Sequence, residues 1–140
     1  MKNIFLSLLV FVVMSLLHAQ FTEWTVRFLS LPGGDFGMYS YFILIFCSVI
    51  TAIGLLTVII FRKHYYSILR IAMLFEIIYL LFLVISGNNP FIYFSDSTSK
   101  NLLKIFMYVI SFIVLFFMYL VHLIYSKIIY PNQKTNIDQC

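Results

Sequence analysis

Glu76 is the residue of this sequence best placed to do chemistry, because it is the only carboxylate inside a long apolar stretch. A carboxylate in lipid costs several kcal/mol unless it is protonated or paired. At a rise of about 1.5 Å per residue, Glu76 lies about 9 Å beyond Arg70, and His122 lies about 7.5 Å inside Lys127. These similar depths predict that Glu76 and His122 form an intramembrane polar pair.

This pair has two interpretations. In the first it is a proton or cation relay, which Ser111, Tyr119 and Tyr125 would continue along the fourth apolar stretch. In the second it is an interhelical hydrogen bond that fixes packing and contributes about 0.6–2 kcal/mol. We favour the second interpretation, because a relay usually needs a further ionisable group deeper in the bilayer and the sequence offers none.

The elements that position these residues are four apolar stretches. The chain is 63% hydrophobic, and its 140 residues include only nine Lys and Arg and five Asp and Glu. Each stretch is close to the roughly 20 residues that cross a bilayer as a helix. We predict an all-α integral membrane protein, a four-transmembrane-helix bundle in one domain. The predicted spans are residues 4–21, 37–61, 67–86 and 105–126, with outer loops 22–36 and 87–104 and a cytoplasmic tail 127–140.

Basic residues indicate the orientation of the bundle. The connection of residues 22–36 carries two acidic residues and one basic residue, whereas the short connection between the second and third spans, residues 62–66, is clearly basic. Because cytoplasmic connections carry an excess of Lys and Arg, we predict an N-in/C-in topology in the cell (inner) membrane. The basic residues behind this prediction are Lys2, Arg62, Lys63, Arg70, Lys127 and Lys134.

The first apolar stretch has an alternative interpretation. Lys2 followed by the apolar run Ile4 to Leu17 is also typical of a signal peptide cleaved after Ala19. The residue three positions before that cut would be Leu17 instead of a small residue, and the 14-residue run is at the upper end for a signal peptide. We therefore favour an uncleaved span. Cleavage would leave three helices.

The segment after the first span has a helical period. One face carries Glu23 and Arg27, and Pro32 follows the segment. The other face is apolar, which predicts a short amphipathic helix on the outer membrane surface with Trp24 and Phe28 as interfacial anchors. An irregular loop with aromatics in the interfacial belt remains the alternative. The apolar face consists of Phe21, Trp24, Phe28 and Leu31.

The second span carries a stripe of small and polar residues on one side. Small residues allow close approach of helix backbones, so we predict that this span is the central packing helix. A lined pore would have the same pattern and is the alternative. The stripe consists of Ser40, Leu44, Cys47, Ser48, Thr51 and Gly54.

No catalytic, nucleotide or cofactor motif stands in the sequence, and His18, His64 and His122 belong to different membrane levels, so we expect no metal site and no cofactor. The basic excess indicates topology and not nucleic-acid binding. The aromatic-rich, alanine-poor composition with short loops resembles that of immunity proteins against pore-forming toxins, without any shared motif.

We therefore predict a non-enzymatic multi-pass membrane protein that acts by helix–helix contacts within the lipid bilayer. It would be an accessory subunit, or an inhibitor or immunity-type partner, of another membrane protein. The alternative is an oligomeric channel or a proton- or cation-linked carrier subunit that uses Glu76 and His122 and associates with itself.

Overall fold

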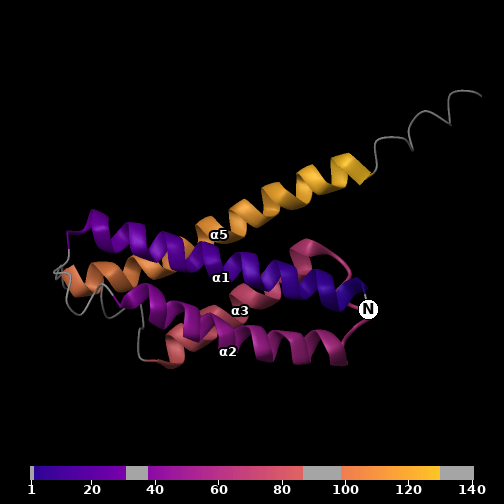
Figure 1. Ribbon diagram of the computed structural model, residues 1–140, viewed down its shortest axis with the longest axis horizontal. Coiled ribbons are helices and arrows are strands. Elements are labelled where there is room, and N and C mark those ends of the chain that lie inside the picture. The colour runs from indigo at the N-terminus through magenta and orange to yellow at the C-terminus, as the bar shows by residue number, and fades with distance from the viewer. Residues whose placement is uncertain (1, 31–37, 87–98, 130–140) are drawn as a thin grey trace, which may run out of the picture.

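The computed structural model describes residues 2–30, 38–86 and 99–129 and consists there of four long α-helices (Figure 1). Each helix contains an apolar stretch long enough to cross a membrane. The prediction of an all-helical protein with four apolar helices, compatible with a membrane bundle, is thereby confirmed. The helices are α1 (Lys2–Phe28), α2 (Tyr39–Ile60), α3 (Ile68–Ile85) and α5 (Ser99–Ile129).

Helix α1 is longer than the first predicted span. Residues 21–28 continue α1 without a break, so the segment predicted as a separate short helix after the first span is part of α1. The ion pair between Glu23 and Arg27, four residues apart, lies in the last turns of α1. The helix ends where Ser30 adopts a φ of 49°, while the N–H of Leu29 donates to the carbonyl of Thr25 at 2.9 Å. Because α1 has 27 residues, at a rise of about 1.5 Å per residue it is about 40 Å long.

Helices α1 and α3 lie at the centre of the bundle. Each of them contacts the three other helices, whereas α2 and α5 do not contact each other within the described residues. The prediction that the second span is the central helix is therefore wrong. The buried polar residues His18 of α1 and Glu76 of α3 meet at this centre, whereas α2 packs on α1 and α3 with a mainly apolar face that includes Cys47 and Gly54.

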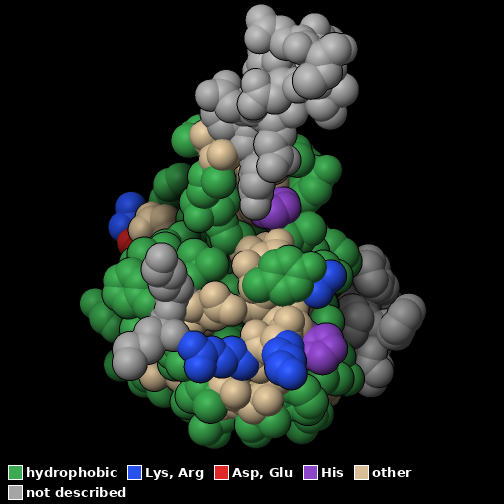
Figure 2. Space-filling model, turned by 90° about the vertical axis from the view of Figure 1, so that its right-hand side faces the viewer, with side chains coloured by type: hydrophobic (Ala, Val, Ile, Leu, Met, Phe, Trp, Pro, Cys, Tyr) green, Lys and Arg blue, Asp and Glu red, His purple; other side chains and the backbone are tan. Residues whose placement is uncertain are grey.

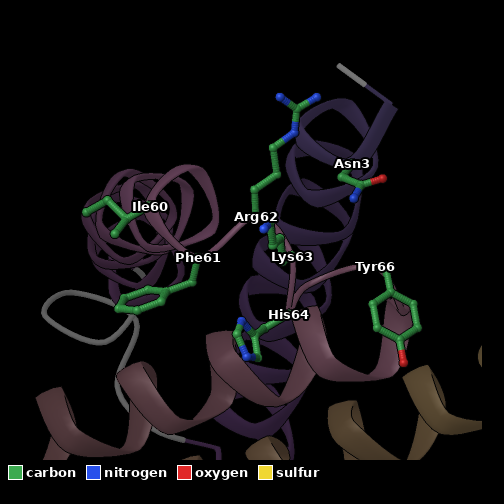
Figure 3. Close-up of a pocket in the computed structure, with 7 residues that line it drawn as sticks. All are labelled: Asn3, Ile60, Phe61, Arg62, Lys63, His64 and Tyr66. Carbon is green, nitrogen blue, oxygen red and sulfur yellow. The ribbon is translucent and has the colours of Figure 1, made fainter.

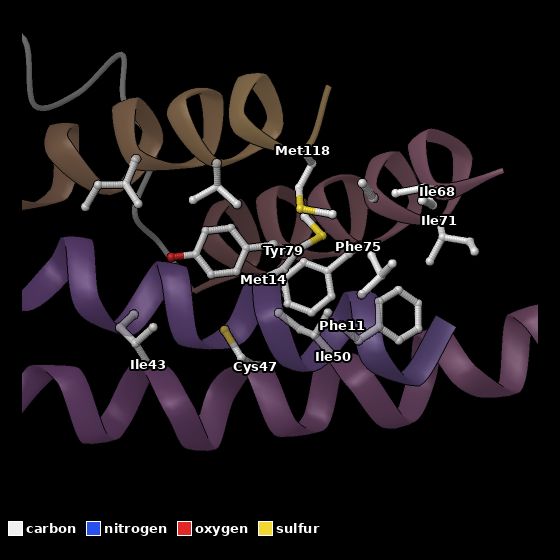
Figure 4. Packing of buried hydrophobic residues seen from close by; sticks show 14 of the residues in the cluster. Phe11, Met14, Ile43, Cys47, Ile50, Ile68, Ile71, Phe75, Tyr79 and Met118 are labelled. Carbon is white, nitrogen blue, oxygen red and sulfur yellow. The ribbon is translucent and has the colours of Figure 1, made fainter. Parts of the chain in front are cut away.

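The buried faces follow the helical period. In α2 the buried residues recur every three or four positions, and in α3 they form one face that packs on α1 and α5. Figure 4 shows the apolar core formed by these faces, in which Phe11 and Phe75 have ring centroids 5.6 Å apart. Most outward-facing side chains are also apolar, as expected where lipid is the solvent.

Candidate functional site

Glu76 lies in the core of the bundle, only 3% exposed, and both of its carboxyl oxygens have partners. Oε1 is 2.9 Å from Nε2 of His18, and Oε2 accepts a hydrogen bond from the hydroxyl of Ser111. His18 belongs to α1, Glu76 to α3 and Ser111 to α5. One carboxyl group therefore joins three helices, and we call these three residues the buried polar network.

His18 lies on the inner face of α1, where polar residues stand beside apolar ones. The hydroxyls on this face donate to carbonyls of the preceding turn, so they are satisfied within their own helix. The imidazole of His18 instead extends to α3, where it is fully buried and its ring lies 4.2 Å from that of Tyr79, centroid to centroid. The back-bonded pairs are Ser7 to Asn3, Ser15 to Phe11, Thr22 to His18 and Thr25 to Phe21.

Two polar atoms beside this network have no hydrogen-bond partner among the described residues. They are Nδ1 of His18 and the hydroxyl of Tyr79, and both are buried. A carboxyl and an imidazole joined by one hydrogen bond can share a proton, and the neutral imidazole has one donor and one acceptor nitrogen. The network therefore has the groups for proton exchange as well as for packing.

The structure does not bring Glu76 and His122 together. His122 lies eleven residues beyond Ser111 on α5, which at about 1.5 Å per residue separates them by about 16 Å along the helix. The predicted Glu76–His122 pair is thus replaced by the contact of Glu76 with His18. The depth count failed because it placed Lys127 at the level of Arg70, whereas the last turns of α5, which carry His122 and Lys127, leave the bundle.

His122 has a different environment. It lines a cavity of about 210 Å³ where the last turns of α5 leave the bundle, and its Nδ1 is buried without a hydrogen-bond partner in the described ranges. We call this cavity the α5 wedge. It is lined by Leu6, Tyr66, Ser67, Ile68, His122, Tyr125 and Ser126.

The small-residue stripe of α2 divides between the interior and the surface. Cys47 and Gly54 are buried, Ser40 and Thr51 are half-buried, and Ser48 is exposed. A Cβ atom added to Gly54 would lie 2.9 Å from ring atoms of Phe11, so α1 and α2 approach closely at this point.

The predicted anchors lie at the end of α1 that is remote from the N-terminus. Trp24 is 57% exposed and Phe28 is 81% exposed, whereas Thr22 and Thr25 face the interior. The aromatic face of this segment therefore points outward from the bundle, away from its hydroxyl face.

Sequence reasoning missed His18 as a partner of Glu76, although a signal for it exists. Ser7, Phe11 and His18 fall on one helical face, and Thr22 and Thr25 extend this face beyond the predicted end of the span. A period that continues through Thr25 places His18 well inside the helix. Within residues 2–30, 38–86 and 99–129, no group of three or more His, Cys, Asp or Glu side chains is arranged to hold a metal ion.

The fold and the buried polar network define a small all-helical protein with four helices long and apolar enough to cross a membrane. Comparisons with protein-family models, with curated proteins and with solved structures gave no match.

Proposed function

We propose that this chain is a non-enzymatic membrane protein that acts through lateral helix contacts, as an accessory subunit or an inhibitor of another membrane protein. The observation that carries this proposal is the C-terminal part of α5. Residues 119–129 diverge from the other helices (Figure 1), and every one of them except His122 and Ser126 is exposed. We call these residues the α5 arm. It offers a long helical surface that the bundle itself does not cover.

The α5 wedge indicates what kind of occupant suits this surface. Hydroxyl groups of Ser67 and Ser126 and the imidazole of His122 line it. An acyl chain cannot form hydrogen bonds with these groups, whereas a helix that carries hydroxyl or amide side chains can. A transmembrane helix of a partner therefore fits the wedge better than lipid does.

A photo-crosslinking amino acid at Tyr125 tests this proposal, because Tyr125 lines the wedge. Phe112 is the matched control, since it lies on the same helix, is aromatic and is 68% exposed outside the wedge. After irradiation of native membranes, we expect an adduct of one defined mass with a different protein from position 125 and only lipid adducts from position 112. Lipid adducts alone from position 125, or equal protein adducts from both, would contradict the proposal.

The second candidate function is an oligomeric channel or a proton- or cation-linked carrier subunit. The contact between Glu76 and His18 favours it, because a carboxyl and an imidazole deep in an apolar bundle are typical of proton pathways. Side chains fill the core of one copy, so a transport path would require self-association. A crosslinked product of two identical chains at position 125 would favour this candidate.

The orientation is also a proposal. The start of α1, the end of α2, the start of α3 and the end of α5 lie at one end of the bundle (Figure 1), and the basic residues Arg62, Lys63, Arg70 and Lys127 belong to these helix ends. By the excess of basic residues in cytoplasmic connections, this end faces the cytoplasm. Trp24 and Phe28 would then lie at the outer interface. An uncleaved first span agrees with the core positions of Phe11 and His18 on α1.

A reporter that is active only outside the membrane tests this orientation. Fused after Lys134 it should be silent, and inserted at Gly33 or Ser97 it should be active, because the charge bias places these positions on opposite sides. Full-length fusion protein must be detected in each case by immunoblot. Activity after Lys134 would reverse the orientation.

A further inference from the structure

A cavity of about 590 Å³ lies at the basic end of the bundle, between the first turn of α1 and the connection from α2 to α3 (Figure 3). We call it the basic cavity. Its volume is in the range that accommodates a small organic ligand. It is lined by Asn3, Ile60, Phe61, Arg62, Lys63, His64 and Tyr66.

Hydrogen bonds and ring contacts order the chain around this cavity. Nη1 of Arg70 donates to the carbonyl of His64 at 3.1 Å, and the guanidinium carbon lies 4.8 Å from the centre of the Tyr66 ring. The N–H of His64 in turn donates to the carbonyl of Phe61 at 2.9 Å. The backbone from Phe61 to His64 and the ring of Tyr66 are thus held in place before any ligand binds, which reduces the entropic cost of binding.

The cations of the basic cavity are not neutralised by the described part of the protein. Neither Arg62 nor Lys63 forms an ion pair with a described carboxylate, because Glu23 pairs with Arg27 and Glu76 contacts His18. Figure 2 shows Lys, Arg and His side chains gathered at this end of the molecule. The cavity therefore has a positive charge that favours an anion.

We propose that the basic cavity binds the phosphate headgroup of an anionic phospholipid. Arg62, Lys63 and the amide of Asn3 supply charged and neutral donors for phosphate oxygens. Ile60 and Phe61 lie at the end of the apolar span, are 72% and 54% exposed, and face the level at which acyl chains begin. An inorganic phosphate ion would use the donors only, whereas a phospholipid uses the donors and the apolar rim.

Native mass spectrometry of the delipidated full chain in detergent tests this site, with dioleoylphosphatidylglycerol and dioleoylphosphatidylcholine as probes. We expect each chain to bind one molecule of phosphatidylglycerol, with a higher affinity than for phosphatidylcholine. In the R62Q/K63Q variant, phosphatidylglycerol affinity should fall by about fivefold for each cation removed, because a basic residue near an anionic membrane contributes about 1 kcal/mol. Phosphatidylcholine affinity should fall less, because its choline cation offsets the charge of its phosphate.

Two further variants control for bulk charge and for folding. Lys127→Gln removes a cation at the same end but outside the basic cavity and should keep phosphatidylglycerol affinity. The R62K/K63R variant preserves both charges and should also keep it. Equal affinities for the two lipids, or an equal loss per charge in Lys127→Gln, would overturn the site. Displacement of phosphatidylglycerol by millimolar inorganic phosphate would overturn the assignment to lipid.

Discussion

Replacing Glu76 by leucine is expected to lower the free energy of unfolding by about 2–4 kcal/mol. The change removes two hydrogen bonds and leaves the imidazole of His18 and the hydroxyl of Ser111 buried without a partner. Glu76→Gln should stay within about 1 kcal/mol of the wild type, because the amide can accept from His18 and donate to Ser111. Thermal or denaturant unfolding in one detergent measures the stability of the wild type, Glu76→Leu and Glu76→Gln.

A double-mutant cycle separates the contact with His18 from the pairing expected with His122. When both partners of a buried pair become apolar, neither is left unsatisfied. The loss of unfolding free energy in E76L/H18L should therefore be smaller than the sum of the losses in E76L and H18L. In contrast, the effects of E76L and H122L should be additive, because Glu76 contacts Ser111 and His122 lies about 16 Å beyond Ser111 along α5. Coupling of Glu76 to His122 and none to His18 would show that the network is assigned incorrectly.

The same variants distinguish the two candidate functions. If the network only fixes packing, Glu76→Gln should keep both stability and any activity of the protein. If it transfers protons, Glu76→Gln should fold normally and lose activity, because an amide does not release a proton at accessible pH. The readout for activity is the function of the partner captured at position 125, or ion flux into proteoliposomes.

The second large effect is expected at Gly54. A leucine there should destabilise the bundle by about 1–3 kcal/mol, because even the first side-chain carbon would lie 2.9 Å from the ring of Phe11. Phe11 has little freedom to move, since it is fully buried and packs on Phe75. Unfolding of Gly54→Leu in detergent, compared with the wild type, measures the loss.

Ala52→Leu is the matched control for Gly54→Leu. It adds a similar side chain two residues away on an exposed position of the same helix, so it should be nearly neutral. A smaller residue at position 11 should relieve the overlap with the new side chain. The loss of unfolding free energy in G54L/F11A should therefore be smaller than the sum of the losses in G54L and F11A. Equal losses in Gly54→Leu and Ala52→Leu would contradict the close approach of α1 and α2.

The sequence by itself determined the fold class. Long stretches without charge, separated by residues such as Arg62 and Lys63, partition into lipid. They form helices there, because lipid offers no hydrogen-bond partners to backbone N–H and C=O groups and a helix satisfies these groups internally. It also determined that Glu76 needs a partner, since a lone carboxylate is costly inside such a helix. The ion pair of Glu23 with Arg27 follows from their spacing alone.

Only the tertiary structure decided which residue meets Glu76. Counting residues gives the depth of a side chain, but not the rotation of its helix or the identity of the neighbouring helix. The depth of His18 depended on where α1 ends, and Thr22, Glu23 and Trp24 do not stop a helix, so the local sequence left that end open. The packing of α1 between α2, α3 and α5 then turned its polar face inward, because buried hydroxyls can satisfy themselves on their own helix while an imidazole and a carboxyl must find each other.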